Sequence, residues 1–182
     1  MAAGRREELL ELAYAYVGEH GLSDLSLRPL AAAIGSSPRV LLFLFGSKDG
    51  LVKALLARAR AEELALLHGR ARGDGLAAAA EAVWGWLSDE AHRPLLRLWV
   101  EAYARSLLDR DGPWSGFAAG TVADWLAVLA DAQPPDVRDT PAGEAARTAV
   151  LAVLRGALLD LLATGDAART TAAVTLRLAS FA

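Results

Sequence analysis

The 182-residue sequence predicts an all-α protein of about nine helices, and three observations support this fold class. Ala and Leu recur at spacings of three and four residues, which is the period of an amphipathic helix. No segment alternates apolar and polar residues for the length that a strand requires. Gly or Pro marks the expected breaks between the helices.

The N-terminal third is expected to contain three helices and the start of a fourth. We predict these helices over residues 5–20, 27–34, 38–44 and 48–68. Ser26, Ser37 and Ser47 are suited to cap them, because a Ser hydroxyl accepts hydrogen bonds from the free amides of a first turn. Gly21 and Gly35 stand where helices should stop, and Gly35 allows the left-handed backbone of an abrupt turn.

Five further helices are expected, over residues 76–89, 94–108, 114–131, 141–164 and 167–181. From residue 149 to 163 the fourth of these is apolar nearly all round, interrupted only by Arg155 and Asp160. A helix that is apolar on every side must be covered on every side. In a chain of this size a second subunit is the natural cover, so we expect a homodimer formed through the last two helices.

The composition argues against an enzyme. The absence of Cys excludes disulfides, thiolate metal sites and Cys nucleophiles. His20, His68 and His92 lie far apart and show no metal-ligand spacing, and no paired-carboxylate motif such as E-x-x-H is present. We therefore expect no cofactor and no metal, although a site assembled across helices stays open. The rival hypothesis is an enzyme built on a helical bundle.

The hydropathy and charge patterns favour a cytoplasmic protein that meets DNA rather than a membrane. The longest stretch without a charged residue, 112–123, has twelve residues, whereas a spanning helix needs about 20. No apolar core of a signal peptide follows the N-terminus. Residues 1–60 hold eight basic and six acidic groups, a net charge of +2, and the remainder carries −5. An excess of positive charge in the N-terminal part fits a DNA-facing segment.

The arrangement of two short helices around a Gly-containing turn, after a longer helix, predicts a helix-turn-helix. Residues 25–35 and residues 37–51, "SPRVLLFLFGSKDGL", resemble the two halves of a TetR-family DNA-binding domain. Phe45, Ser47, Lys48, Asp49 and Leu51 match that pattern in identity and spacing, and the resemblance covers about residues 5–58.

This resemblance implies a transcriptional repressor that binds double-stranded operator DNA as a homodimer and is released by a small-molecule effector. It implies a DNA-binding domain over residues 1–47 and a helical domain for ligand binding and dimerisation over residues 48–182. Family members use the second short helix to enter the major groove.

The expected recognition helix departs from the family pattern. Leu42 replaces the usual Tyr and Leu44 replaces a common His or Tyr, so two phosphate-binding groups are missing. The remaining candidates for DNA contact are Ser36, Ser37, Arg39 and Phe43 at bases, with Arg28 and Lys48 at phosphates. Leu42 and Leu44 could instead pack on the fourth helix. The alternative function is a protein-interaction module that kept the helix-turn-helix fold and lost DNA binding.

Aromatic residues on the C-terminal helices suggest a ligand pocket. All five Trp residues lie there, and Trp99 and Tyr103, four residues apart, share a helix face. We predict that Trp99, Tyr103, Phe117 and Trp125 line a cavity for a largely apolar ligand. The alternative is that these side chains are simply part of the core.

Overall fold

The computed structural model describes residues 2–22, 25–70, 75–109 and 111–181. These residues form ten α-helices and two short 3₁₀ turns, and no strand occurs among them. The expectation of an all-α protein is therefore confirmed. The chain divides into two compact units, the first comprising Met1–Glu62 with Pro94–Ala119 and the second comprising Glu63–Arg93 with Gly120–Ala182.

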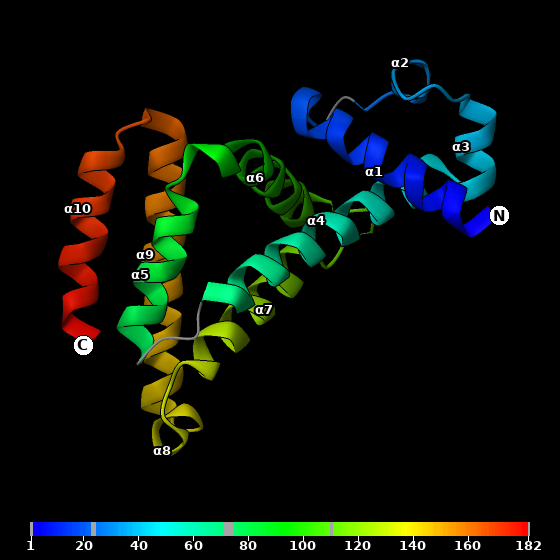
Figure 1. The fold of residues 1–182 in the computed structure, drawn as a ribbon. Coiled ribbons are helices and arrows are strands. Elements are labelled where there is room, and N and C mark those ends of the chain that lie inside the picture. The colour runs from blue at the N-terminus through cyan, green and yellow to red at the C-terminus, as the bar shows by residue number, and fades with distance from the viewer. Residues whose placement is uncertain (1, 23–24, 71–74, 110, 182) are drawn as a thin grey trace. The chain divides into compact units, whose positions relative to one another are not determined.

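The first unit contains the helix-turn-helix. Its N-terminal elements are α1 (Ala2–His20), α2 (Leu27–Ala33), α3 (Pro38–Phe45) and the beginning of α4 (Lys48–Arg70), and most of α6 (Arg93–Leu108) also belongs to it (Figure 1). The core of the N-terminal helices consists of apolar side chains from each of them: Leu9, Ala13, Val17, Leu30, Ala31, Ile34, Leu41, Phe45 and Leu51. These residues recur at helical spacing, so the buried stripe follows directly from the sequence pattern.

The second unit is a helical layer around α9 (Pro141–Thr164). Helices α9 and α10 (Ala167–Leu178) run antiparallel side by side, and α5 (Leu76–Leu87) packs on both (Figure 1). The unit also holds the C-terminal end of α4, most of α7 (Phe117–Asp131) and the short α8 (Pro135–Arg138). Trp84, Trp86, Leu154, Leu158 and Val174 are all buried in it.

The predicted caps are confirmed in two cases and corrected in one. The Ser37 Oγ accepts a hydrogen bond from the Val40 amide at 3.3 Å, and the Ser47 Oγ accepts one from the Gly50 amide at 2.9 Å. Ser26 occupies the N-cap of α2, but its hydroxyl makes no capping hydrogen bond. Gly35 has the predicted positive φ, 63°, at the turn between α2 and α3.

Most predicted helices differ from the observed ones by one to three residues at one end, and three differences from the prediction have an identifiable cause or form. Helix α7 begins at Phe117 instead of residue 114, because Gly116 has a φ of 75° and interrupts the helical backbone. The four-residue α8, which was not predicted, begins at Pro135, where the fixed φ of Pro suits a first helical position. Helix α10 ends at Leu178 and continues as the 3₁₀ turn Ala179–Phe181.

None of the described helices is by itself long and apolar enough to cross a membrane. Helices α2 and α3 would pass such a test together by length and composition, but they are bent by 102°. That bend is the turn of the helix-turn-helix.

Candidate DNA interface and ligand groove

Helix α3 has one buried face and one exposed face. Leu41 and Phe45, four residues apart, are buried in the first unit. Arg39, Val40 and Phe43 lie on the opposite face, and the Phe43 side chain is 83% exposed. Residues three and four apart share a helix face, so α3 presents outward one cation near its N-terminus followed by two apolar side chains.

The predicted phosphate-binding residues and Arg39 all reach the surface. Arg28, Arg39 and Lys48 are exposed, whereas Ser36 and Ser37 are half-buried. The Ser37 hydroxyl is already occupied as the cap of α3. The three cations are thus accessible to DNA, and Ser37 has a structural role that sets the start of the helix.

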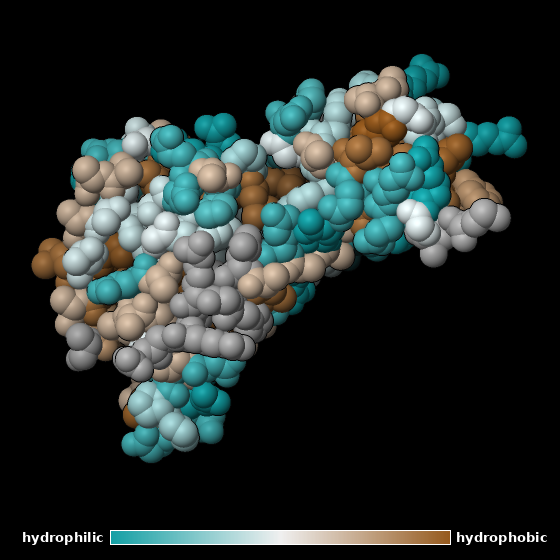
Figure 2. Space-filling view, in the orientation of Figure 1, coloured by the Kyte–Doolittle hydropathy of each residue, from teal (hydrophilic) through white to brown (hydrophobic). Residues whose placement is uncertain are grey.

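Leu42 lies at the surface instead of in the core. Its side chain is 41% exposed, and Leu44 is half-buried. Hydrophobic surface therefore appears among hydrophilic side chains around α2 and α3 (Figure 2). The position at which the TetR family usually has Tyr is therefore accessible here, but Leu42 has no polar atom that could bind a phosphate.

A cluster around Arg58 joins α1 to α4, and the sequence analysis did not identify it. The Arg58 guanidinium donates to Glu11 at 2.6 Å and to Glu62 at 2.9 Å, and it lies 4.8 Å from the centre of the Tyr14 ring. Burial, reinforced by the charge of Glu62, raises the pKa of Tyr14 above its usual range. The hydrogen bond with Glu11 raises the pKa of Arg58. The cluster fixes α1 against the helix that follows the helix-turn-helix.

A second link joins α6 to the segment that connects α1 with α2. The Glu101 Oε2 accepts a hydrogen bond from the Leu22 amide at 3.0 Å. Gly21, with a φ of 79°, makes the preceding turn, and a Cβ there would lie 3.5 Å from the same carboxylate oxygen. Glu101 therefore holds the backbone directly before the helix-turn-helix against α6, which also carries Trp99 and Tyr103.

The four predicted ligand residues are divided between the two units. Trp99 and Tyr103 lie together in the first unit, with ring centres 5.0 Å apart, and Phe117 is buried in the same unit. Trp125 belongs to the second unit, where its indole Nε1 donates to the Glu63 carboxylate at 2.5 Å.

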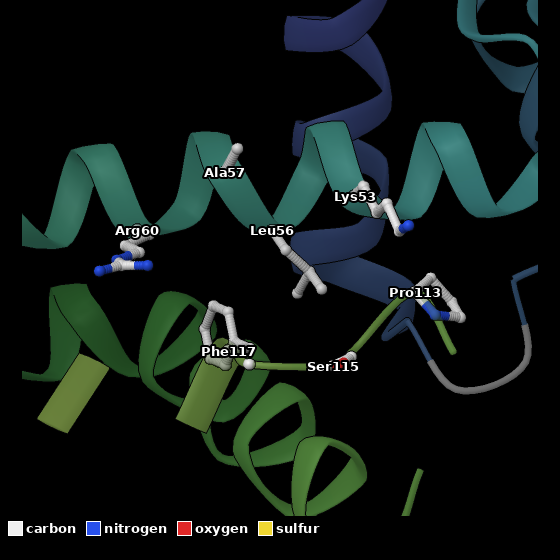
Figure 3. Close-up of a pocket in the computed structure, with 8 residues that line it drawn as sticks. Lys53, Leu56, Ala57, Arg60, Pro113, Ser115 and Phe117 are labelled. Carbon is white, nitrogen blue, oxygen red and sulfur yellow. The ribbon is translucent and has the colours of Figure 1, made fainter. Parts of the chain in front are cut away.

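An open groove of about 290 Å³ lies in the first unit between α4 and the segment that leads into α7 (Figure 3). Leu56 and Phe117 point toward one another across it, and Lys53 and Arg60 lie at either side of Leu56 along α4. The remaining lining residues are Ala57, Pro113, Ser115 and Gly116. Phe117 was among the predicted ligand residues. Lys53 and Arg60 were not among the predicted ligand residues, and they add cationic groups to a groove that Leu56 and Phe117 make partly apolar.

The outer face of α9 and α10 is open and largely apolar. Gly156 is exposed and a Cβ there would meet nothing within 4 Å, while Leu159 is 51% and Leu176 is 80% exposed. A shallow groove of about 250 Å³ runs between the two helices. Its lining residues are Val153, Gly156, Ala157, Asp160, Thr170, Ala173, Val174 and Arg177. Figure 2 shows hydrophobic surface at the outer edge of α10.

Within the part of the chain that the structure describes, no three His, Asp or Glu side chains are grouped so that they could hold a metal ion. His20 stacks on Tyr16, and His92 stacks on Trp86. The side chain of His68 lies outside the described residues.

Comparisons with known proteins agree with this geometry. Residues 9–55 match the family model described as bacterial regulatory proteins, tetR family. A TetR transcription regulator from Haloarcula marismortui is 16% identical, with a TM-score of 0.75, and the match covers 99% of this chain and 97% of that one. A transcriptional regulator from Rhodococcus sp. Rha1 is 22% identical, with a TM-score of 0.74 over 97% and 95% of the two chains. No curated protein of significant similarity was found.

A third similar structure is the multidrug binding protein EbrR in complex with imidazole. It is 25% identical, with a TM-score of 0.67 over 96% of this chain and 89% of that one. The matched segment contains the helix-turn-helix, and the remaining helices share the fold of the C-terminal domains in these regulators. Residues 9–55 thus resemble the tetR family, and the chain as a whole has the fold of solved TetR-family regulators.

Proposed function

We propose that the chain is a repressor that binds operator DNA as a homodimer and leaves it when a small ligand binds. The observation that carries this proposal is the exposed outer face of α3, with Arg39 in its first turn, inside the segment that matches the tetR family model. In a helix-turn-helix, the N-terminal residues of this helix contact base edges in the major groove. Such a protein regulates by binding, and the proposal needs no catalytic step.

The open face of α9 and α10 supports the dimer. It carries a small residue, Gly156, and the exposed side chains of Leu159 and Leu176. Small residues let two helices approach closely, and the apolar surface gains stability when a second copy covers it. A two-fold dimer would present two copies of α3 to the two halves of one operator.

The aromatic residues of the first unit support a small, largely apolar ligand. Trp99 and Tyr103 lie together on α6, and Phe117 lines the groove beside Leu56. EbrR, one of the similar structures, is a multidrug binding protein, and we extend small-molecule binding to this chain by analogy. We propose Trp99, Tyr103, Phe117 and Trp125 as ligand residues, with residues 1–47 as the DNA-binding domain and residues 48–182 as the ligand-binding and dimerisation domain.

The hydrogen bond between Glu101 and the Leu22 amide provides a physical route between the two activities. A ligand that shifts α6 would move the backbone that precedes α2. One coupling free energy would then link the two binding events, so that each bound partner lowers the affinity of the protein for the other by the same factor.

The test is selection of bound sequences from a random DNA pool by the purified protein, followed by gel shifts in rising salt. We expect a sequence with two-fold symmetry and an affinity that falls steeply with salt. The salt dependence arises because Arg and Lys side chains displace the counterions that are bound to the phosphates. Failure to select any sequence would contradict the proposal. It would favour the second candidate, a protein-interaction module, for which the exposed apolar side chains of α3 provide the argument.

A further inference from the structure

We infer that Phe43 recognises the 5-methyl group of thymine, so that each half of the operator contains a thymine selected by an apolar contact. The inference rests on the proposed DNA binding and adds to it the class of base that α3 recognises. It concerns the feature in which this chain departs from its family, namely a recognition helix whose outward face has one charged residue followed by apolar ones.

The exposure of Phe43 is the first observation. Its side chain is 83% exposed, although Phe is among the residues most often buried. The two residues of α3 that anchor the helix, Leu41 and Phe45, are already buried, and the Arg6 guanidinium lies 4.9 Å from the centre of the Phe45 ring. Phe43 is therefore not needed to hold α3 in place, and it projects from the face opposite the core.

The neighbours of Phe43 on that face are the second observation. Val40, three residues earlier, is 39% exposed, and Leu42 at the edge of the face is 41% exposed. Arg39 is the one charged residue that α3 contains. Beyond Arg39, this face can offer a base neither a hydrogen-bond donor nor an acceptor from a side chain.

An apolar face discriminates among bases in a definite way. The major-groove edge of a G·C pair carries no methyl group, whereas the edge of an A·T pair carries the 5-methyl group of thymine. A Phe ring pressed on a polar edge removes water from that edge without replacing its hydrogen bonds, which is unfavourable. The same ring gains free energy when it buries a methyl group. Phe43 thus favours thymine both by attraction and by exclusion of the alternatives.

The spacing on α3 also places this thymine relative to the base that Arg39 contacts. Four residues separate Arg39 from Phe43 along α3, which corresponds to about 6 Å of helix rise. Base pairs are stacked about 3.4 Å apart. Because Arg pairs best with guanine, we expect a guanine and a thymine within about two base pairs of each other in each half-site.

The inference is tested by replacing thymines of the selected operator, one symmetric pair at a time, with deoxyuridine. This change removes the 5-methyl group and leaves base pairing intact. At the position that Phe43 contacts, we expect the wild-type protein to bind about fourfold more weakly for each methyl lost, from the free energy of burying one carbon. Loss of both symmetric methyls should therefore weaken binding about fifteenfold, if the two half-sites act independently.

Two variants make the result specific to Phe43. Phe43→Ala should bind the thymine and deoxyuridine operators equally at that position, because the ring that senses the methyl is gone. Leu108→Ala removes a comparably exposed apolar side chain, 84% exposed at the end of α6, and should keep the wild-type ratio. Both side chains are exposed, so thermal unfolding should confirm that the two variants keep the stability of the wild type.

The outcomes separate the inference from the proposal on which it rests. Equal binding of thymine and deoxyuridine at every position overturns the inference and leaves the proposed function intact. A ratio that persists in Phe43→Ala also overturns it, since the effect would then come from another residue or from DNA shape. If the wild-type protein selects no DNA at all, the proposed function itself has failed.

Discussion

Arg39 and Lys48 are both exposed cations next to the turn, but their positions give them different tasks. Arg39 lies in the first turn of α3, on the same face as Phe43, whereas Lys48 is the first residue of α4. A Lys at a helix N-terminus opposes the helix dipole, so a phosphate ligand would explain why the position is basic. Direct contact with a base and contact with a phosphate leave different signatures in binding measurements.

Substitution of the two residues should separate these roles. Arg39→Ala should cost about 1–3 kcal/mol of discrimination and relax one base position in each half-site. Lys48→Ala should weaken binding to all sequences alike and reduce the salt slope by about 1. Gel shifts on the selected operator and on random DNA, across a salt series, measure both quantities. Equal losses of specificity in the two variants would contradict this assignment.

Leu42 offers a test of how the first unit meets DNA. Because its side chain is 41% exposed, Leu42→Tyr should leave the free energy of unfolding within about 0.5 kcal/mol of the wild type. The new hydroxyl should reach a phosphate and strengthen non-specific binding about fivefold, as one hydrogen bond of roughly 1 kcal/mol would. Leu42→Phe is the matched control, since it adds the ring without the hydroxyl. Lower stability without tighter binding would show that Leu42 does not face DNA.

At the scale of the elements, α6 is tied to the start of the helix-turn-helix by one hydrogen bond, from the Leu22 amide to Glu101. Glu101→Gln keeps the shape of the side chain but removes the charge that strengthens this bond. We expect faster hydrogen exchange at the Leu22 amide and a melting temperature lower by about 2–4 °C. Glu81→Gln, at an exposed position of α5, should change neither. Unchanged protection of Leu22 would contradict the link.

The connection between α9 and α10 gives a pH-dependent contribution to stability. The Arg169 guanidinium donates two hydrogen bonds to Asp160, at 2.8 and 2.6 Å, and these lower the pKa of that carboxyl from its ordinary 3.8. A lowered folded-state pKa means that the stabilisation is present above pH 3.8 and is lost as the pH falls through the folded-state value. Thermal unfolding of wild type and Asp160→Asn should therefore differ at pH 7 and converge toward pH 2. A difference that persists in acid would contradict this account.

The sequence predicted some elements closely and others poorly, for identifiable reasons. Helix α9 begins and ends where expected, because the Thr140 side chain and Pro141 start it and Gly165, with a φ of 72°, stops it. Helix α8 was missed, since four residues are too few for a hydrophobic period to be visible. The exposure of Phe43 also agrees with its predicted place on the recognition helix.

The ligand groove shows what sequence patterns cannot provide. Lys53 and Arg60 are seven residues apart and share a face of α4, and this periodicity is visible in the sequence. Nothing in the sequence indicates that this face lies beside Pro113 and Phe117, about sixty residues later. Pairing of distant segments depends on tertiary packing, so the cationic residues of the groove could be found only in the structure.

For the whole molecule, the open face of α9 and α10 predicts a dimer in solution. Gly156→Arg should place a bulky charge in the helix seam and yield monomer or aggregate at micromolar concentration, as measured by sedimentation. Gly85→Arg is the matched control, because Gly85 is also an exposed helical glycine with nothing within 4 Å of a Cβ. It should remain dimeric. A monomeric wild-type protein would show that the open face of α9 and α10 does not form a dimer interface.

The distribution of tryptophan has a practical consequence. All five indoles lie between residues 84 and 125 and are at most 8% exposed, and none falls in the segment that matches the DNA-binding family model. Intrinsic fluorescence excited at the indole band therefore arises entirely from outside that segment. A ligand that binds beside Trp99 in the first unit should quench or shift this emission, whereas DNA bound at α3 should act on it only through a conformational change. Titration of each partner with one optical signal would thus show directly whether events at α3 are transmitted to the rest of the chain.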